Sequence, residues 1–381
     1  MALQGERAYT VAMSASPILT VVGARPNFMK AAPVHRAFEA RGIPHAIVHT
    51  GQHYDAAMSK VFFEDLGMPE PAVYMGVGSG SHAVQTANIM TGFEQVCADY
   101  APRMVLVVGD VNSTVAAALV AAKLQIPVGH VEAGLRSRDW AMPEEVNRAV
   151  TDVLSDILLT PSPDADANLL AEGKPADRIV CVGNVMIDTL LTHLERARAL
   201  PVPEQHGLTP GEYAVLTLHR PSNVDDPAVL GPLVEVLLEL SEKVPMVFPV
   251  HPRTRARLEA AGLSERLEAA ASVTLLEPLG YLEFLSLTSR ARLVLTDSGG
   301  LQEETTALGI PCLTLRENTE RPITVSEGTN LVVGVDPDRI RAETLDILAT
   351  GGKQGRTPDL WDGKASERIV DAVLAPLAAR A

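Results

Sequence analysis

Short apolar runs alternate with longer segments of helical periodicity along the chain. In the first half, the runs ILTVVGA, HAIVHTG, MVLVVGD, PVGHVEA, DILLTP and IVCVGN begin at Ile18, His45, Met104, Pro127, Asp156 and Ile179. Their apolar residues are consecutive, which is typical of strands buried on both faces of a parallel sheet. Segments with helical patterns, such as residues 82–99 and 113–124, separate the runs. This pattern predicts a doubly wound α/β domain.

The alternation stops after Asn184 and then starts again. The segment VMIDTLLTHLERARALPVPEQHGLTP reads as a helix followed by a connection that contains prolines, and six further apolar runs follow it: YAVLTLH, MVFPVH, VTLLEP, LVLTDS, PCLTLR and NLVVG. A chain of 381 residues exceeds what one hydrophobic core usually serves. We therefore predict two Rossmann-like α/β domains that face a central crevice. Their expected ranges are 17–184 and 185–364, and a C-terminal helix within 365–381 is expected to return to the first domain.

The composition narrows the classes of partner. The chain has 46% hydrophobic residues, 4% aromatic residues and a net charge of −15. Because a negative protein repels polyanions, we expect neither nucleic acid nor a membrane surface as a partner. No apolar stretch approaches the roughly 18 residues of a membrane span, and the widely spaced cysteines suggest neither a disulfide framework nor a thiolate metal site. These features predict a cytoplasmic protein.

Polar residues follow directly after most of the predicted strands. The carboxyl ends of the strands in an open parallel sheet border the ligand crevice, so these positions are the candidates for chemistry. They hold Arg25, Lys30, Gln52, His53, Asp110, Glu132, His219, Arg220 and Arg253. For any single one of them, a surface charge or a helix cap is the simpler interpretation. Their shared placement at strand ends favours a binding site.

The segment LVLTDSGGLQEE joins a predicted strand tightly to a helix. Such a turn directs unpaired backbone N–H groups and the positive end of the helix dipole towards one point, which suits a phosphate. Gly299 and Gly300 would let the backbone approach an anion, and Ser298 can cap the helix or donate a hydrogen bond. One turn later, Glu303 or Glu304 is placed to accept a hydrogen bond from a ribose. An ordinary polar turn between a strand and a helix explains the same residues equally well.

Four common catalytic motifs are absent from the sequence. There is no GxGxxG between the first strand and its helix, no GxxxxGK[ST], no HExxH and no GxSxG. Their absence argues against a dinucleotide cofactor, a P-loop, a zinc site of that type and a hydrolase nucleophile. We expect no cofactor and no metal, so the chemistry falls to carboxylates, histidines and cations.

Three carboxylates are placed to act on a ligand in the crevice. Asp110 follows the third predicted strand, Glu132 ends the fourth, and Glu144 falls in the first turn of a helix that Pro143 starts. Taken alone, Glu144 is equally well explained as a partner of the helix dipole, and Asp110 as the N-cap of the next helix. Together with His219, the carboxylates form a set suited to proton transfer.

Ten short segments in a fixed order span nearly the whole chain: GARPNFMK, TGQHY, GDVNST, HVEAGLRS, MPEEVNR, GNVMIDTL, LHR, HPRT, TDSGGLQEE and TERP. In these motifs the sequence resembles the non-hydrolysing UDP-N-acetylglucosamine 2-epimerases, which have the two-domain GT-B architecture. The resemblance implies reversible C2 epimerisation of UDP-N-acetylglucosamine to UDP-N-acetylmannosamine without a dissociable redox cofactor. It also implies a homodimer that feeds bacterial cell-surface polysaccharide synthesis.

The resemblance further implies roles for single residues. The catalytic centre would consist of Asp110, Glu132, Glu144 and His219. The residues near the diphosphate would be Arg25, Lys30, Ser298 and Arg321, together with Gly299 and Gly300 of the same turn. Glu304 would bind the ribose, and Phe284 would lie by the uracil. In some relatives a second UDP-sugar near the TGQH segment activates the enzyme, which makes Gln52 and His53 a candidate regulatory site.

Two segments depart from the usual sequence of that family. The first loop reads ARPNF where many members have an acidic residue after the proline, and LHRPSN replaces the more usual arginine-glutamate-asparagine after the histidine. Both changes lie near the expected sugar, so the sequence also fits a 2-epimerase of a modified UDP-sugar, such as a diacetamido uronic acid. TERP and QEE favour the N-acetylglucosamine branch. The same fold and UDP anchor would also suit a GT-B glycosyltransferase or a UDP-sugar-binding regulator.

Inversion at C2 of a sugar needs a special route because no carbonyl group adjoins that carbon. Oxidation of a neighbouring hydroxyl by NAD is one route, but its sequence fingerprint is missing. In the other route, UDP leaves C1 while a carboxylate takes the C2 proton, which gives a glycal and free UDP. UDP then adds back after a proton reaches the opposite face of C2. Cations at the β-phosphate would stabilise the leaving group.

Overall fold

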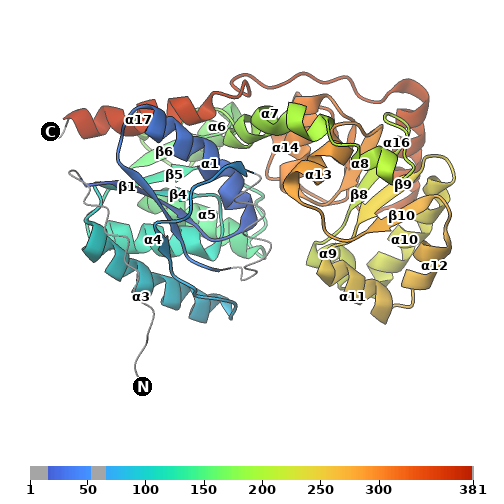
Figure 1. The fold of residues 1–381 in the computed structure, drawn as a ribbon, viewed down its shortest axis with the longest axis horizontal. Coiled ribbons are helices and arrows are strands. Elements are labelled where there is room, and N and C mark those ends of the chain that lie inside the picture. The colour runs from blue at the N-terminus through green and yellow to red at the C-terminus, as the bar shows by residue number, and fades with distance from the viewer. Residues whose placement is uncertain (1–15, 53–65, 380–381) are drawn as a thin grey trace.

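Two parallel β-sheets, each covered by helices, make up the computed structural model, which describes residues 16–52 and 66–379. The two sheets lie side by side along the long axis of the molecule, each in its own half (Figure 1). Within the described residues, neighbouring strands pair in parallel in both sheets. The predicted fold class of two doubly wound α/β units is confirmed.

The first sheet has seven strands in the order β3-β2-β1-β4-β5-β6-β7. They are β1 (Ile18–Val22), β2 (His45–His49), β3 (Val73–Tyr74), β4 (Met104–Val108), β5 (Val128–Val131), β6 (Ile157–Thr160) and β7 (Ile179–Cys181). Six of them fall on the predicted apolar runs, whereas the two residues of β3 are too few to give a periodic signal. The strand order reverses between β1 and β4, so the loops after these two strands diverge and leave a crevice.

Helices cover both faces of this sheet. They are α1 (Arg25–Ala40), α3 (His82–Tyr100), α4 (Asn112–Lys123), α5 (Pro143–Leu154), α6 (Pro163–Ala171), the short η1 (Ala176–Arg178) and the C-terminal α17 (Ala365–Ala379). Helices α1 and α17 pack over Ile18 and Leu106 on one face, and α3 and α4 pack over Leu19 and Val105 on the other. Adjacent strand residues therefore enter different apolar layers, which explains the consecutive apolar runs in the sequence.

The second sheet has six strands in the order β10-β9-β8-β11-β12-β13. They are β8 (Ala214–Thr217), β9 (Met246–Pro249), β10 (Val273–Leu276), β11 (Leu293–Thr296), β12 (Cys312–Thr314) and β13 (Asn330–Val332). All six lie on predicted runs. Here the order reverses between β8 and β11, which places a second crevice at the carboxyl ends of those two strands.

Mostly short helices surround the second sheet. They are α8 (Val202–Gln205), α9 (Pro221–Val224), α10 (Pro227–Ser241), α11 (Pro252–Ala260), α12 (Ser264–Ala269), α13 (Tyr281–Thr288), α14 (Gly299–Leu308), α15 (Pro322–Ser326) and α16 (Pro337–Thr350). Several of these helices, among them α9, α10, α11, α15 and α16, have proline at their first position, where the missing N–H costs no hydrogen bond. The apolar side chains of α10 and α16 join the strand residues Leu216, Phe248 and Leu295 in one core.

Two segments connect the halves. Helix α7 (Val185–Arg198) contacts α1 and α17 of the first half and α13 and α14 of the second. After α16 the chain returns across the molecule to α17, which lies beside α1 (Figure 1). The buried carboxylate of Asp188 in α7 accepts hydrogen bonds from the backbone N–H groups of Ala365 and Ser366, at 3.0 and 2.7 Å, and so caps α17. Because α7 belongs to the packing of both halves, domain limits at 17–184 and 185–364 stay a prediction.

Candidate active site

A cleft of about 1180 Å³ separates the two halves at the carboxyl ends of both sheets. Its walls include the start of α1, the loop after β4, the start of α5, the loop after β8 and the start of α14. The cleft is somewhat larger than the usual range of about 300 to 1,000 Å³ for small-molecule sites. It is lined by ten of the predicted site residues: Lys30, Asp110, Glu144, His219, Phe284, Ser298, Gly299, Gly300, Glu304 and Arg321.

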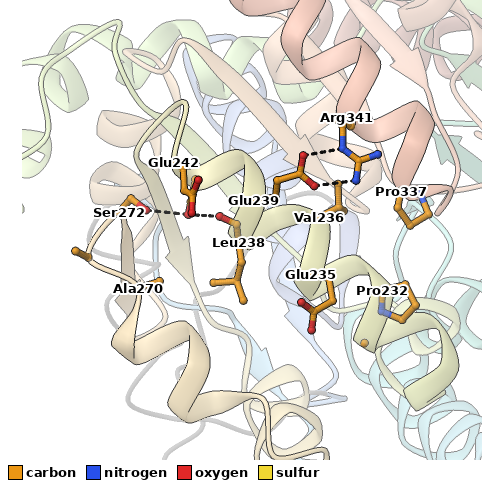
Figure 2. A pocket seen from close by; sticks show the side chains of 13 residues that line it. Pro232, Glu235, Val236, Leu238, Glu239, Glu242, Ala270, Ser272, Pro337 and Arg341 are labelled. Carbon is orange, nitrogen blue, oxygen red and sulfur yellow. Dashed lines mark hydrogen bonds and ion pairs between the residues drawn. The ribbon is translucent and has the colours of Figure 1, made fainter.

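A separate groove lies on the outer surface of the second half, between α10 and α16 (Figure 2). Its charged side chains are partly satisfied by one another, since Nη2 of Arg341 lies 2.8 Å from Oε2 of Glu239. None of the predicted site residues lines this groove. The cleft between the halves is therefore the candidate site.

Glu132 lies behind the cleft wall and links its two sides. Its carboxylate pairs with the ammonium of Lys30, from the first half, and with Nη2 of Arg321, from the second half, at 3.1 Å. Its backbone has a φ of 75°, which for a residue with a side chain costs about 1 to 3 kcal/mol. Gly109 lies close to this carboxylate, and its own φ of 69° is a conformation that favours glycine. Strain of this kind, held in place by surrounding contacts, is common at functional sites.

Arg321 is a buried cation in the wall of the cleft. Its guanidinium contacts Glu132, Glu303 and Glu320. Burial alone would lower the pKa of Arg321, but these three carboxylates raise it above its ordinary value. Gly299 lies against the same group, since a Cβ there would approach Nη1 of Arg321 to 2.6 Å. The start of α14 and the guanidinium therefore lie against each other in the cleft wall.

Asp110 pairs with Arg148 of α5. Its Oδ2 lies 2.7 Å from Nη2 of Arg148, and Nη1 of the same arginine lies 2.6 Å from Glu145. Burial pushes the pKa of Asp110 upwards, but Arg148, Lys30 and Arg321 outweigh it and hold that pKa below its usual value. The interpretation of Asp110 as a helix N-cap is wrong, because Val111 occupies that position in α4 without a side-chain cap. Asp110 is therefore ionised at neutral pH.

His219 lies on the opposite wall, directly after β8. Its Nδ1 is 2.9 Å from Oδ1 of the buried Asp297, and the rest of the ring is half-exposed to the cleft. Ser298 stands at the N-cap position of α14, but its hydroxyl makes no capping bond to the helix. The first-turn N–H groups of an α-helix have no partner within the helix, so a bound anion is able to accept from them.

Comparison with known proteins connects this geometry to a family. The sequence model of the UDP-N-acetylglucosamine 2-epimerase family matches residues 36–374. The chain belongs to the UDP-N-acetylglucosamine 2-epimerase family. The resemblance read from the motifs is therefore confirmed, and the protein is an isomerase by family.

Three relatives illustrate the likeness. The UDP-N-acetylglucosamine 2-epimerase of Methanocaldococcus jannaschii is 42% identical over 355 residues, which are 92% of this chain and 96% of that protein. The UDP-2,3-diacetamido-2,3-dideoxy-D-glucuronate 2-epimerase of Pseudomonas aeruginosa is 45% identical over 360 residues, 93% of this chain and 98% of that protein. The crystal structure of the M. jannaschii enzyme in complex with UDP-GlcNAc and UDP aligns with a TM-score of 0.87 and 41% identity, covering 94% of this chain and 99% of that one.

Two acidic residues of α14 are buried deep in this epimerase cleft. Burial, together with the neighbouring Glu303, raises the pKa of Glu304 to about 8, although a hydrogen bond from Tyr281 opposes the rise. Burial also raises the pKa of Glu303, to about 7, against the attraction of Arg321. At neutral pH the Glu304 carboxyl is largely protonated and can both donate and accept a hydrogen bond. Phe284, on α13, also lines the cleft.

Glu144 lines the cleft from the first turn of α5, as the sequence predicts. Its place in that turn also leaves the helix-dipole interpretation standing. Its neighbour Glu145 points away from the cleft and accepts hydrogen bonds from the backbone N–H groups of Ser137 and Arg138, both at 2.9 Å. The two adjacent glutamates therefore have different surroundings, and of the two only Glu144 lines the cleft.

Of the three remaining predicted residues, Gln52 is the one whose side chain the structure describes, and it does not line the cleft. Gln52 is buried, and its side-chain carbonyl accepts hydrogen bonds from the N–H and hydroxyl of Ser113, at 3.0 and 2.7 Å, at the start of α4. His53 lies outside the described residues. Arg25 begins α1, but its side chain also lies outside what the structure describes.

The sequence did not predict the ion pairs of four charged groups in this site: Arg148, Asp297, Glu303 as a partner of Arg321, and Glu320. Two of these groups have a local signal in the sequence. Arg148 follows Glu145 at i,i+3 spacing on a predicted helix, and Glu320 adjoins Arg321 in the TERP motif. Asp297 gave no local signal, because its partner His219 is 78 residues away.

Proposed function

We propose that the protein interconverts UDP-N-acetylglucosamine and UDP-N-acetylmannosamine by inverting C2. The observation that carries this proposal is the Glu132 carboxylate, held between Lys30 of one half and Arg321 of the other. A base beside two cations suits a reaction that removes a proton while an anionic group departs. The confirmed family and the names of the relatives support the same substrate.

The leaving group is the first requirement of the mechanism. As the bond between C1 and oxygen breaks, negative charge grows on the β-phosphate of UDP. Lys30, Arg321 and the start of α14 are positioned to stabilise that charge, and we assign Arg25, Ser298, Gly299 and Gly300 to the same diphosphate site. In this proposal Glu304 binds the ribose and Phe284 contacts the uracil.

Proton transfer at C2 is the second requirement. A base must remove the C2 proton on one face to give the glycal, and an acid must return a proton to the other face before UDP adds back. We assign these transfers to Asp110 and Glu144, which line the cleft from the first half, and to Glu132, whose carboxylate lies behind the cleft wall. His219, from the second half, is assigned to the departing phosphate.

Incubation with UDP-N-acetylglucosamine alone, without acceptor or added cofactor, tests the proposal. In heavy water we expect the manno epimer with deuterium at C2, and traces of UDP and glycal. Release of free N-acetylmannosamine would indicate a hydrolysing relative, and absence of any reaction would contradict the epimerase assignment. Product that fully keeps its original C2 hydrogen would exclude the elimination route.

A second candidate substrate is a UDP-diacetamido uronic acid. The P. aeruginosa enzyme that acts on such a sugar is 45% identical to this chain, close to the 42% of the M. jannaschii enzyme. The unusual LHRPSN segment places Pro221 and Ser222 in the cleft wall, near the expected sugar. Side-by-side measurement of kcat/KM for the two UDP-sugars decides between them, since the true substrate should exceed the other by more than tenfold.

A homodimer is the assembly that we propose. Helix α5 exposes Val146, Val150 and Val153, at spacings of four and three residues, which form one apolar stripe on the helix. A second copy would remove this stripe from water. Light scattering on the purified protein, with Val150→Glu as the disrupting variant, tests the assembly. A monomeric parent at micromolar concentration would contradict it.

No helix within the described residues is long and apolar enough to span a membrane. We keep a cytoplasmic location and a role in cell-surface polysaccharide synthesis as proposals. Regulation by a second UDP-sugar at Gln52 and His53 is likewise a proposal, which saturation kinetics would test through sigmoidal dependence on substrate.

A further inference from the structure

Asp297 combines several contacts in one buried carboxylate. It is fully buried at the end of β11, next to β8, which leads into His219. Its oxygens accept hydrogen bonds from the backbone N–H groups of His219 and Arg220, at 2.9 and 2.8 Å, and from the side chain of Asn223 at 3.2 Å. Oδ1 also lies 2.9 Å from Nδ1 of the His219 ring. One side chain therefore holds both the ring and the loop that carries it.

The His219 ring has two distinct ends. Nδ1 faces the buried carboxylate, whereas no hydrogen-bond partner is found for Nε2 among the described residues. His219 lines the cleft, and its side chain is 38% exposed. The nitrogen that remains for a ligand is therefore Nε2.

We infer that Asp297 is a positioning residue, which holds Nδ1–H of His219 towards the protein and thereby presents Nε2 to the departing phosphate. This inference rests on the proposed function. Without the carboxylate the ring could rotate or exchange its tautomer, and either nitrogen could then face the cleft. A buried carboxylate that orients an imidazole is a recurrent arrangement in enzymes.

The chemistry of the departing phosphate requires this orientation. Only an imidazolium carries an N–H on both nitrogens, so one can bind Asp297 while the other donates to an oxygen of UDP. When the bond between C1 and oxygen breaks, its electron pair passes to that phosphate oxygen, and the hydrogen bond from Nε2–H strengthens as charge grows. Asp297 compensates the ring charge throughout.

The protonation state of the Asp297 carboxyl fits this role. Burial would raise its pKa, but His219 and the backbone N–H groups of the loop hold it below the usual value. The carboxyl is therefore ionised at neutral pH and accepts hydrogen bonds only. The same contacts would equally serve a carboxylate that merely fastens the loop, so the test must separate the two roles.

The first test uses the parent protein and does not depend on activity. Nitrogen-15 spectra of the histidine-labelled full chain, saturated with UDP, should show His219 with a proton on Nδ1, the resonance being assigned by its loss in His219→Ala. A bare Nδ1 with a proton on Nε2 alone would overturn the inference, whether or not any variant folds.

The second test is a double-mutant cycle on turnover. Asp297→Asn should lower kcat by about 10- to 100-fold, the range found for groups that orient a metal-ligating histidine through its second ring nitrogen. In a His219→Ala background the same substitution should cost less than about twofold, because its target is gone. An equal loss in both backgrounds would assign Asp297 to loop structure alone. Asp297→Asn with parental kcat would also overturn the inference.

Thr217→Val is the matched control. Thr217 ends β8 and bonds Thr296 of β11 through their hydroxyls at 2.6 Å, so it links the same two strands without touching the imidazole or the carboxylate. We expect its kcat to stay within about twofold of the parent, because residues that share no contact are usually independent to within about 0.5 kcal/mol. A loss equal to that of Asp297→Asn would show that strand linkage, and not ring orientation, sets turnover. If the parent itself does not epimerise, the proposed function fails while the spectroscopic test still decides the orientation.

Discussion

Glu132 and the diphosphate of UDP should compete for the same guanidinium. Arg321 lies 3.1 Å from Glu132 in the structure, and Lys30 pairs with the other oxygen of that carboxylate. Both cations are buried, so their charges are poorly screened by solvent. Glu132→Gln keeps the shape of the side chain and removes its charge. We expect this variant to bind UDP more tightly and to turn over more slowly than the parent.

The size of the binding effect follows from the geometry. Two anions held by one guanidinium lie about 5 Å apart, and at an effective dielectric constant of about 20 their repulsion is about 3 kcal/mol per unit charge. Local relaxation reduces this figure, so we expect a gain of about 1 to 3 kcal/mol, which is roughly 5- to 150-fold in Kd. The loss of a proton-transfer group should lower kcat by about two to four orders of magnitude.

Calorimetric titration with UDP and steady-state kinetics provide the two measurements. Glu172→Gln is the control, because Glu172 pairs with Arg136 at 2.7 Å, is partly exposed and does not line the cleft. The control should bind UDP like the parent. Equal or weaker UDP binding by Glu132→Gln would show that Glu132 and the diphosphate do not share Arg321. Normal turnover would remove Glu132 from the proton transfers.

Three further predictions follow from other contacts. Burial raises the pKa of Glu304 from 4.5 to about 8, so the stability that its protonated form provides is present below about pH 4.5 and is lost as pH rises through 8. Glu304→Gln should therefore melt at a higher temperature than the parent at pH 8 and at the same temperature at pH 4. Parallel melting profiles of the two proteins across this pH range would contradict the prediction. Asp188→Ala removes the cap of α17 and should lower the free energy of unfolding by about 1 to 2 kcal/mol. Asp188→Asn should lose less, because it keeps an acceptor oxygen. Equal melting temperatures for the parent and Asp188→Ala would show that the cap does not stabilise the protein. Because the proposed UDP site takes residues from both halves, saturating UDP should close the cleft about α7 and reduce the radius of gyration in small-angle scattering; an unchanged radius would argue against closure.

The local pattern of the sequence determined the two-sheet architecture. Ile18 and Leu19 enter opposite apolar layers of the first sheet, and this two-sided burial is what a consecutive apolar run records. The six runs of each half accordingly mark strands, and the strand ends mark the cleft that holds Lys30, Asp110 and His219. Such features depend on neighbours within a few residues, so the chain order displays them directly.

The short motifs predicted more about the function than the hydrophobic periodicity did. The confirmed family followed from short segments whose order spans nearly the whole chain. They also selected most of the residues that line the cleft. Short motifs do not, however, state which side chains pair. Asp110 illustrates this, because its sequence position allowed a helix cap, whereas it pairs with Arg148 from another helix.

Only the tertiary structure decided how the charges are grouped. Glu132 meets Arg321 across the cleft although 189 residues separate them, and Asp297 meets His219 over 78 residues. Asp188 caps α17 through a hydrogen bond from Ala365, which lies 177 residues further along the chain. These contacts arise because strand order, reversed at β1 and β4 and again at β8 and β11, brings distant loops together. Ion pairs across such loops depend on the distance between charges in space, and no local periodicity in the sequence encodes that distance.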